Sequence, residues 1–199
     1  MDRRHYTIMT FDDHRAAARE LATVRRSLTE FDKLSRFGRR VPGRLHTNVK
    51  RIHNALDRIQ TGMCEVLART LPSDAQTGSC WAELETMKPN AAARRSIAVL
   101  TLDQHIRTAR ALGPAKPAVR RFLGIINKRR HLPVRIMDHA IRINILIQML
   151  RCQMEDVQFY TMRGRGIPWV NCWLGPSNCF DGEEDGCRAD AQPAGEGRE

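Results

Sequence analysis

Hydrophobic positions recur along much of this chain at alternating steps of four and three, which is the spacing of one face of an α-helix. The first such series comprises Ala17, Leu21, Val24, Leu28 and Phe31. Thr10 and Asp13 precede it in the pattern of a capping box, and Gly38 follows it. The pattern predicts a helix of roughly 25 residues that ends before Gly38.

The second series is the most regular heptad pattern of the chain. Its apolar positions are Leu45, Val49, Ile52, Leu56, Ile59, Met63 and Val66. Pro72 closes this segment, and a turn rich in Gly and Pro at residues 38–43 separates it from the first. Because a short loop between two long helices makes them antiparallel neighbours, we predict an αα-hairpin.

The middle of the chain predicts three further helices. A short one runs from Ser79 to Met87, and an Ala-rich one from Asn90 to Leu112 has Val99, Leu102, Ile106 and Ala109 on one face. The segment Gly113 to Pro117 breaks the pattern, and a shorter helix follows at about residues 117–130. Its inward side chains are Val119, Phe122, Leu123 and Ile126.

The last helix spans about 30 residues, from Pro133 to just before Gly164. A second full heptad runs through Ile136, Ala140, Ile143, Ile147, Leu150, Met154 and Val157. Ile145, Leu146 and Met149 point in other directions, so this helix is apolar nearly all round. Such a helix is typical of a bundle centre or a subunit interface.

These elements predict an all-α fold: a helical bundle of four long helices plus one or two short ones, with an antiparallel first hairpin. The bundle domain covers residues 1–163. Residues 164–199 form a second segment that contains Trp and Cys and ends in an acidic, Gly-rich tail, whose residues 181–199 we expect to be disordered. The unbroken heptads indicate a homo-oligomer in which another subunit completes an apolar seam.

Charge changes the picture, because the chain carries 33 Lys and Arg against 22 Asp and Glu, a net charge of +11. The 34 residues between Asp103 and Asp138 contain no carboxylate at all. Their cations are Arg107, Arg110, Lys116, Arg120, Arg121, Lys128, Arg129, Arg130 and Arg135. Concentrated positive charge attracts polyanions, so this basic stretch is the best indication of a nucleic-acid partner.

Helical periodicity over 117–130 places Arg120, Arg121 and Lys128 outward, on either side of Gly124. A mid-helix glycine fits the close approach of a phosphate strand or, equally, of a neighbouring helix. Arg39, Arg40 and Arg44 in the first hairpin turn form a second basic cluster. If both clusters face one way, the surface can follow a phosphate backbone, and the scarcity of aromatic residues nearby favours phosphate contacts over base readout.

We therefore predict a non-catalytic RNA- or DNA-binding accessory or assembly factor within a nucleoprotein complex. The alternative is a protein-binding or self-assembling helical scaffold whose basic surface meets an acidic partner. A plain solvated face and the capping of helix ends are the simplest explanations of the same charges.

A minor alternative is catalysis. Arg40 and His46 have the Arg-x5-His spacing of HEPN ribonucleases, although Val41 is apolar where that family usually has a polar residue. A chain with 33 cations produces such spacings by chance. We therefore assign no catalytic residue and expect no cofactor.

The six cysteines and the remaining histidines give no standard metal site. Cys172, Cys179 and Cys187 lack the close pairs that usually bind zinc. Cys64 and Cys152 are interpreted as small core residues, and His105 and His139 as hydrogen-bonded groups near the core. His53 and Asp57 share a helical face and are a weak candidate metal pair.

Met1 to Arg4 do not resemble a targeting signal, and the longest apolar stretch, Ile143 to Leu150, is too short to cross a bilayer. We therefore expect reduced thiols in a cytoplasmic protein without a membrane partner. Residues 180–199 carry seven acidic and two basic side chains. This tail either competes with polyanions for the basic surface or keeps a basic protein soluble, the second being preferred.

Overall fold

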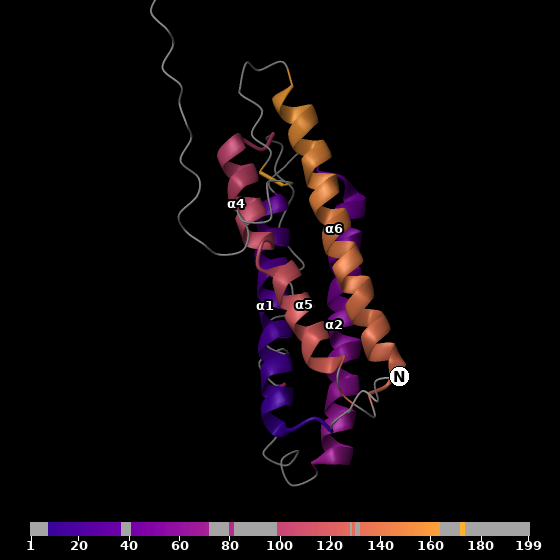
Figure 1. Cartoon of the computed structure of the whole chain (residues 1–199). Helices are drawn as coiled ribbons and strands as arrows, with labels where there is room; N and C mark the ends of the chain where they lie inside the picture. The colour runs from indigo at the N-terminus through magenta and orange to yellow at the C-terminus, as the bar shows by residue number, and fades with distance from the viewer. Residues whose placement is uncertain are drawn as a thin grey trace, which may run out of the picture.

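The computed structural model of the chain describes residues 8–36, 41–71, 80–81, 99–127, 129, 132–163 and 172–173. Its helices are α1 (Phe11–Ser35), α2 (Gly43–Thr70), α4 (Leu102–Leu112), α5 (Ala115–Ile126) and α6 (Val134–Met162). The described residues contain no β-sheet, and the predicted all-α bundle is confirmed (Figure 1). Over the described ranges, no helix combines the length and the apolar character needed to cross a bilayer.

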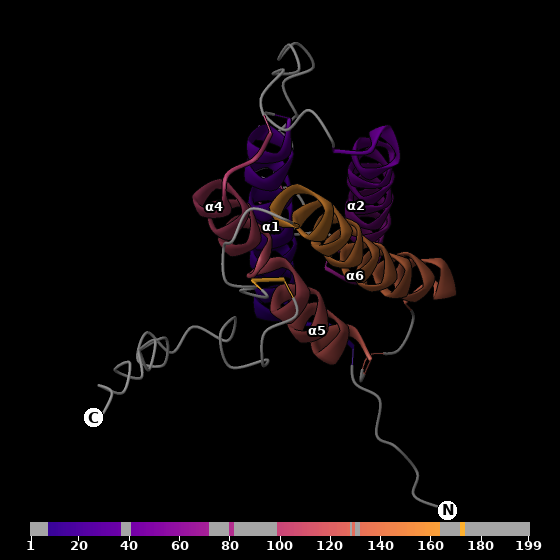
Figure 2. The same cartoon turned by 90° about the horizontal axis from the view of Figure 1, so that it is seen from above.

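The helices form four rods, because α4 and α5 follow one another as a single rod that is interrupted at Gly113 and Pro114 (Figure 1). Around the bundle the order is α1, α2, α6 and then α4 with α5, which packs again on α1. Figure 2 looks down on this arrangement, with α2 and α4 on opposite sides of α1. Every rod is antiparallel to its neighbours.

Polar contacts between helices fix the register of the rods. Arg25 of α1 pairs with Asp57 of α2, and closer to the hairpin turn Asp32 bonds His46. The falling residue number on α2 against the rising number on α1 confirms the antiparallel first hairpin. Further cross-helix pairs in the described part of the chain include Arg135–Glu65, Arg121–Glu20, Lys116–Gln148 and His105–Thr161.

The three predicted apolar series lie in the core. Every apolar position of the series in α1, α2 and α6 is buried, from Ala17 to Phe31, from Leu45 to Val66 and from Ile136 to Val157. Burial of these side chains is the main source of the bundle's stability. Two tryptophans from outside the helices add to it, because Trp81 and Trp173 are 3% and 1% exposed.

Two helix boundaries differ from the prediction. A single helix over Asn90–Leu112 is wrong, because Thr101 is extended and caps α4 through a capping box with Gln104. The buried face of α4 consequently includes His105 and Thr108, whereas Leu102 and Ile106 are only half-buried. The expected short helix at 79–87 falls almost entirely outside the described residues.

The shorter basic helix begins and ends earlier than predicted. α5 starts at Ala115, so Pro117 lies in its first turn, where the missing N–H costs no helix hydrogen bond. It ends at Ile126 with Asn127 as its C-cap, so Arg129 follows the helix rather than belonging to it.

Candidate nucleic-acid interface

An open groove on the surface of the bundle contains cations from both basic clusters. Arg44 lies in the first turn of α2, and Lys116 and Arg120 lie one turn apart on α5. The side of α6 completes the groove with Asn144, Ile145, Gln148, Met149, Cys152 and Gln153. Its volume is about 550 Å³, and none of the described residues that line it is acidic.

The bundle register explains why these residues meet. Lys116 Nζ donates a hydrogen bond of 3.0 Å to Gln148 Oε1, which joins α5 to α6 at the level of the groove. Because α5 and α6 are antiparallel, Arg120 reaches the level of Asn144 one turn further along. Arg44 comes from the start of α2, which packs on the other side of α6.

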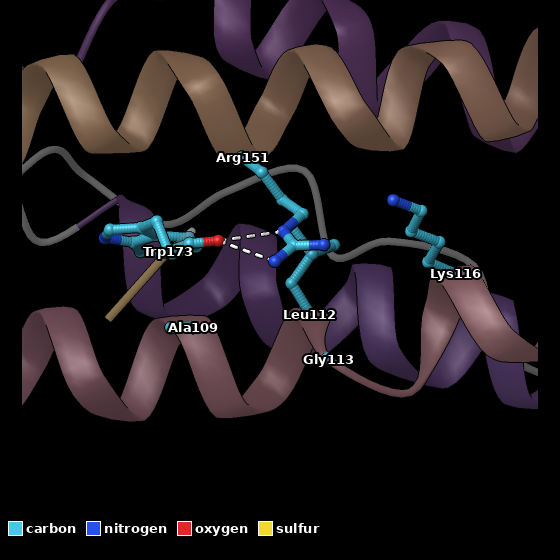
Figure 3. Close-up of a pocket in the computed structure, with 6 residues that line it drawn as sticks. All are labelled: Ala109, Leu112, Gly113, Lys116, Arg151 and Trp173. Atoms are coloured by element: carbon cyan, nitrogen blue, oxygen red, sulfur yellow. Dashed lines mark hydrogen bonds between the residues drawn. The ribbon is translucent and has the colours of Figure 1, made fainter. Parts of the chain in front are cut away.

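Positive charge accumulates beside the groove as well as in it. Arg151 of α6 is half-buried, and burial lowers the pKa of its guanidinium. The charge of nearby Arg120 acts in the same direction. The Arg151 Nε and Nη2 atoms both donate to the backbone oxygen of Trp173, at 3.0 and 2.6 Å (Figure 3).

Many of the other predicted cations are neutralised by acids that are distant in the sequence or one helical turn away. The ion pairs are Arg107–Asp103 at 2.8 Å, Arg121–Glu20 at 2.9 Å, Arg129–Asp13 at 2.8 Å and Arg135–Glu65 at 2.7 Å. The hydrogen bond to Glu20 also raises the pKa of Arg121. These four arginines stabilise the bundle surface and are less available to a polyanion than their sequence context indicates.

The remaining predicted residues divide into two groups. Arg110 is exposed on α4, forms no ion pair with a described residue and does not line the groove. Lys128, Arg130, Arg39 and Arg40 lie outside the described residues. Gly124 is exposed, and a Cβ built there would meet no described atom within 4 Å, so close helix packing does not explain this glycine.

Comparison with protein families, with curated proteins and with solved structures finds no match to this chain.

Sequence reasoning missed the contribution of α6 to the groove. Ile145 is 55% exposed and Met149 44% exposed, although the same helix buries its heptad face completely. The sequence did contain an indication of this exposure, because Ile145 and Met149 do not belong to the heptad positions that form the buried face.

Cys64 and Cys152 were wrongly predicted to be core residues, since both are exposed. Cys152 is seven residues from Ile145 and therefore shares its outward face.

The histidine of the Arg-x5-His spacing has a clear structural contact. His46 Nδ1 lies 2.8 Å from Asp32 Oδ1, and Arg36 bonds the other oxygen of the same carboxylate. Burial alone would raise the pKa of Asp32, but the hydrogen bonds from His46 and Arg36 outweigh it and lower the pKa. This cluster fastens the end of the first hairpin. Arg40 lies outside the described residues, so a HEPN-like ribonuclease stays a prediction.

The candidate metal ligands are also accounted for by other contacts. Asp57 pairs with Arg25 rather than facing a site with His53, and the described part of the chain contains no group of three metal-binding side chains.

The Cys172 thiol donates to Gln158 Oε1 at 3.1 Å, and burial raises its pKa to about 11. A thiol held protonated in this way is a poor zinc ligand. Cys179 and Cys187 lie outside the described residues.

Proposed function

We propose that the chain is a cytoplasmic, non-catalytic nucleic-acid-binding bundle that serves as an accessory or assembly factor in a nucleoprotein complex. The groove between α2, α5 and α6 is its binding site. The proposal rests on one observation: Arg44, Lys116 and Arg120 line one groove, and none of the described lining residues is acidic. Guanidinium and ammonium groups in such a site bind phosphate oxygens through charge-assisted hydrogen bonds.

The proposed binding surface is smaller than the whole basic stretch between Asp103 and Asp138. Because Arg107, Arg121, Arg129 and Arg135 already have carboxylate partners, they contribute less to phosphate binding. Three groove cations imply a modest salt dependence, with log K falling by about 2 to 3 per tenfold rise in salt. The amides of Asn144, Gln148 and Gln153 supply further polar contacts along the same groove.

The test is fluorescence anisotropy with labelled single-stranded RNA, single-stranded DNA and duplex DNA over a series of salt concentrations. The variant R44E/K116E/R120E should lose binding at low salt and keep its helicity. A matched control is R19E/R26E/K50E, which reverses the same number of exposed cations outside the groove. Equal losses in both variants would show that the groove is not the site, and no binding by the unaltered chain would refute the function.

A protein partner is the second candidate, and the exposed apolar side chains of α6 favour it. Ile141, Ile145 and Met149 are each more than 40% exposed at helical spacing, which suits an amphipathic helix or a second copy of this chain. Ile145→Arg should disrupt such an interface. Sedimentation analysis of the chain and this variant over a concentration series distinguishes self-association from a monomer that binds nucleic acid.

A further inference from the structure

The floor of the groove has a property that nucleic-acid phosphates do not explain. Ile145, Met149 and Cys152 present an exposed apolar strip between the cations of α2 and α5. Phosphate oxygens gain nothing from aliphatic side chains, and the described lining residues include no aromatic side chain that could stack on a base. The chemistry therefore fits an occupant that places an apolar group beside several carboxylates.

The chain carries such a segment in its own sequence. Phe180 is followed directly by Asp181, Gly182, Glu183, Glu184 and Asp185. An aromatic ring next to four acids complements an apolar floor beside three cations. A second copy of the groove face would be a poor occupant, because it would bring like charges together.

The structure holds the chain close to the groove just before this segment. Trp173 is buried, with its ring at right angles to those of Phe31 and His105. Arg151 bonds its backbone oxygen and directly precedes Cys152 of the groove floor. Figure 3 shows Arg151 between Trp173 and Lys116, and Lys116 lines both the Trp173 pocket and the groove.

The chain after Trp173 is long enough for Phe180 to reach the groove. Phe180 is the seventh residue after Trp173, and an extended chain covers at most about 25 Å over seven residue steps. A tether this short also gives a high effective concentration, on the order of millimolar, so a weak contact is enough to occupy the groove.

We propose that residues 180–185 bind in the groove as an internal competitor. Phe180 covers Ile145 and Met149, and the carboxylates contact Arg44, Lys116 and Arg120. Nucleic acid must displace this acidic segment, so weak non-specific binding is suppressed. The competition rests on the proposed function, whereas the docking itself can be measured without nucleic acid.

Disulfide trapping in the full chain tests the docking. Cys179 precedes Phe180, and Cys152 lies on the groove floor. Mild oxidation with diamide should join Cys179 to Cys152 within one chain, as read by mass spectrometry of proteolytic peptides. Cys64 is an exposed control twenty residues beyond Arg44, about 30 Å along α2. R44E/K116E/R120E should abolish the preference for Cys152. Equal trapping at Cys64, or bridges mainly between chains, would overturn the proposal.

Binding measurements then test the competition. E183Q/E184Q/D185N should tighten single-strand binding several-fold at low salt, and removal of residues 177–199 should do at least as much. D190N/E196Q/E199Q neutralises the same number of acids farther along the tail and should have a smaller effect. Equal effects of the two triple variants would mean general electrostatics and would overturn the competition. If no form binds nucleic acid but trapping selects Cys152, the proposed function fails and the docking stands.

Discussion

At the scale of single residues, the bundle holds several histidines in their neutral form. His14, His53 and His105 are each less than 5% exposed, and burial lowers the pKa of all three. For His105 the pKa falls from 6.5 to about 4. Its Nε2 lies 3.2 Å from Thr161 Oγ1, which confirms the prediction of a hydrogen-bonded group near the core.

This shift predicts a loss of stability in mild acid. The unfolded chain takes up a proton on His105 near pH 6.5, whereas the folded chain does not until pH 4. The neutral, buried His105 therefore contributes its full stabilisation above pH 6.5, and this contribution is lost as the pH falls toward 4. The total loss in the free energy of unfolding is about 3 kcal/mol. His105→Asn should unfold in urea with a smaller difference between about pH 7 and about pH 5 than the unaltered chain.

His139→Asn is the control, because His139 is only half-buried and should affect the pH dependence less. Asp13 and Asp32, whose pKa values are lowered, affect stability in a separate pH range. Their contribution to the free energy of unfolding is lost only below the ordinary carboxyl pKa of 3.8. An unchanged pH dependence in His105→Asn would contradict the assignment.

At the scale of the helices, two glycines have opposite surroundings. A Cβ at Gly124 of α5 would meet no described atom within 4 Å, whereas a Cβ at Gly62 of α2 would lie 3.1 Å from Cδ1 and Cγ1 of Ile136. Gly124→Ala should therefore stabilise the bundle by about 1 kcal/mol through helix propensity alone. Gly62→Ala should stabilise the bundle less, or destabilise it, because the side chain of Ile136 must give way to the new Cβ. Urea unfolding of both variants measures the difference, and equal gains would show that α2 and α6 are not closely packed.

Helix periodicity was sufficient to predict the rods, because each apolar series predicts one buried face and Gly or Pro indicates where the turns lie. It was insufficient at α4, where the capping box of Thr101 sets the start of the helix and the buried face includes His105 and Thr108. Residues whose burial depends on a polar partner do not follow an apolar pattern.

The candidate site could be predicted only in part for a related reason. The cations were correctly identified as concentrated in sequence, but the acids that neutralise Arg121 and Arg129 are 101 and 116 residues away. Only the packing of α5 on α1 brings these charges together. The packing of α5 and α2 on α6 brings Lys116 and Arg120 into one groove with Arg44, which their distance in the sequence did not reveal.

At the scale of the whole molecule, the core depends on a residue that lies beyond the last helix. Trp173 packs among α1, α4 and α6 through Phe31, His105 and Arg151. Filling the space between three helices with one indole makes the bundle dependent on the segment that follows Met162. The predicted division at residue 163 is therefore best examined by truncation.

Removal of residues 172–199 should cost about 3 to 5 kcal/mol of the free energy of unfolding, the usual loss when a buried tryptophan is deleted. Arg151 would also lose two hydrogen bonds to the Trp173 backbone. Removal of residues 177–199 takes away none of the described residues and should cost much less, no more than the weak contact proposed between residues 180–185 and the groove. Urea unfolding followed by circular dichroism compares the two truncations, and Trp173→Ala separates the indole from the rest of the segment. Equal stability of both truncations would show that the helices form their core without Trp173.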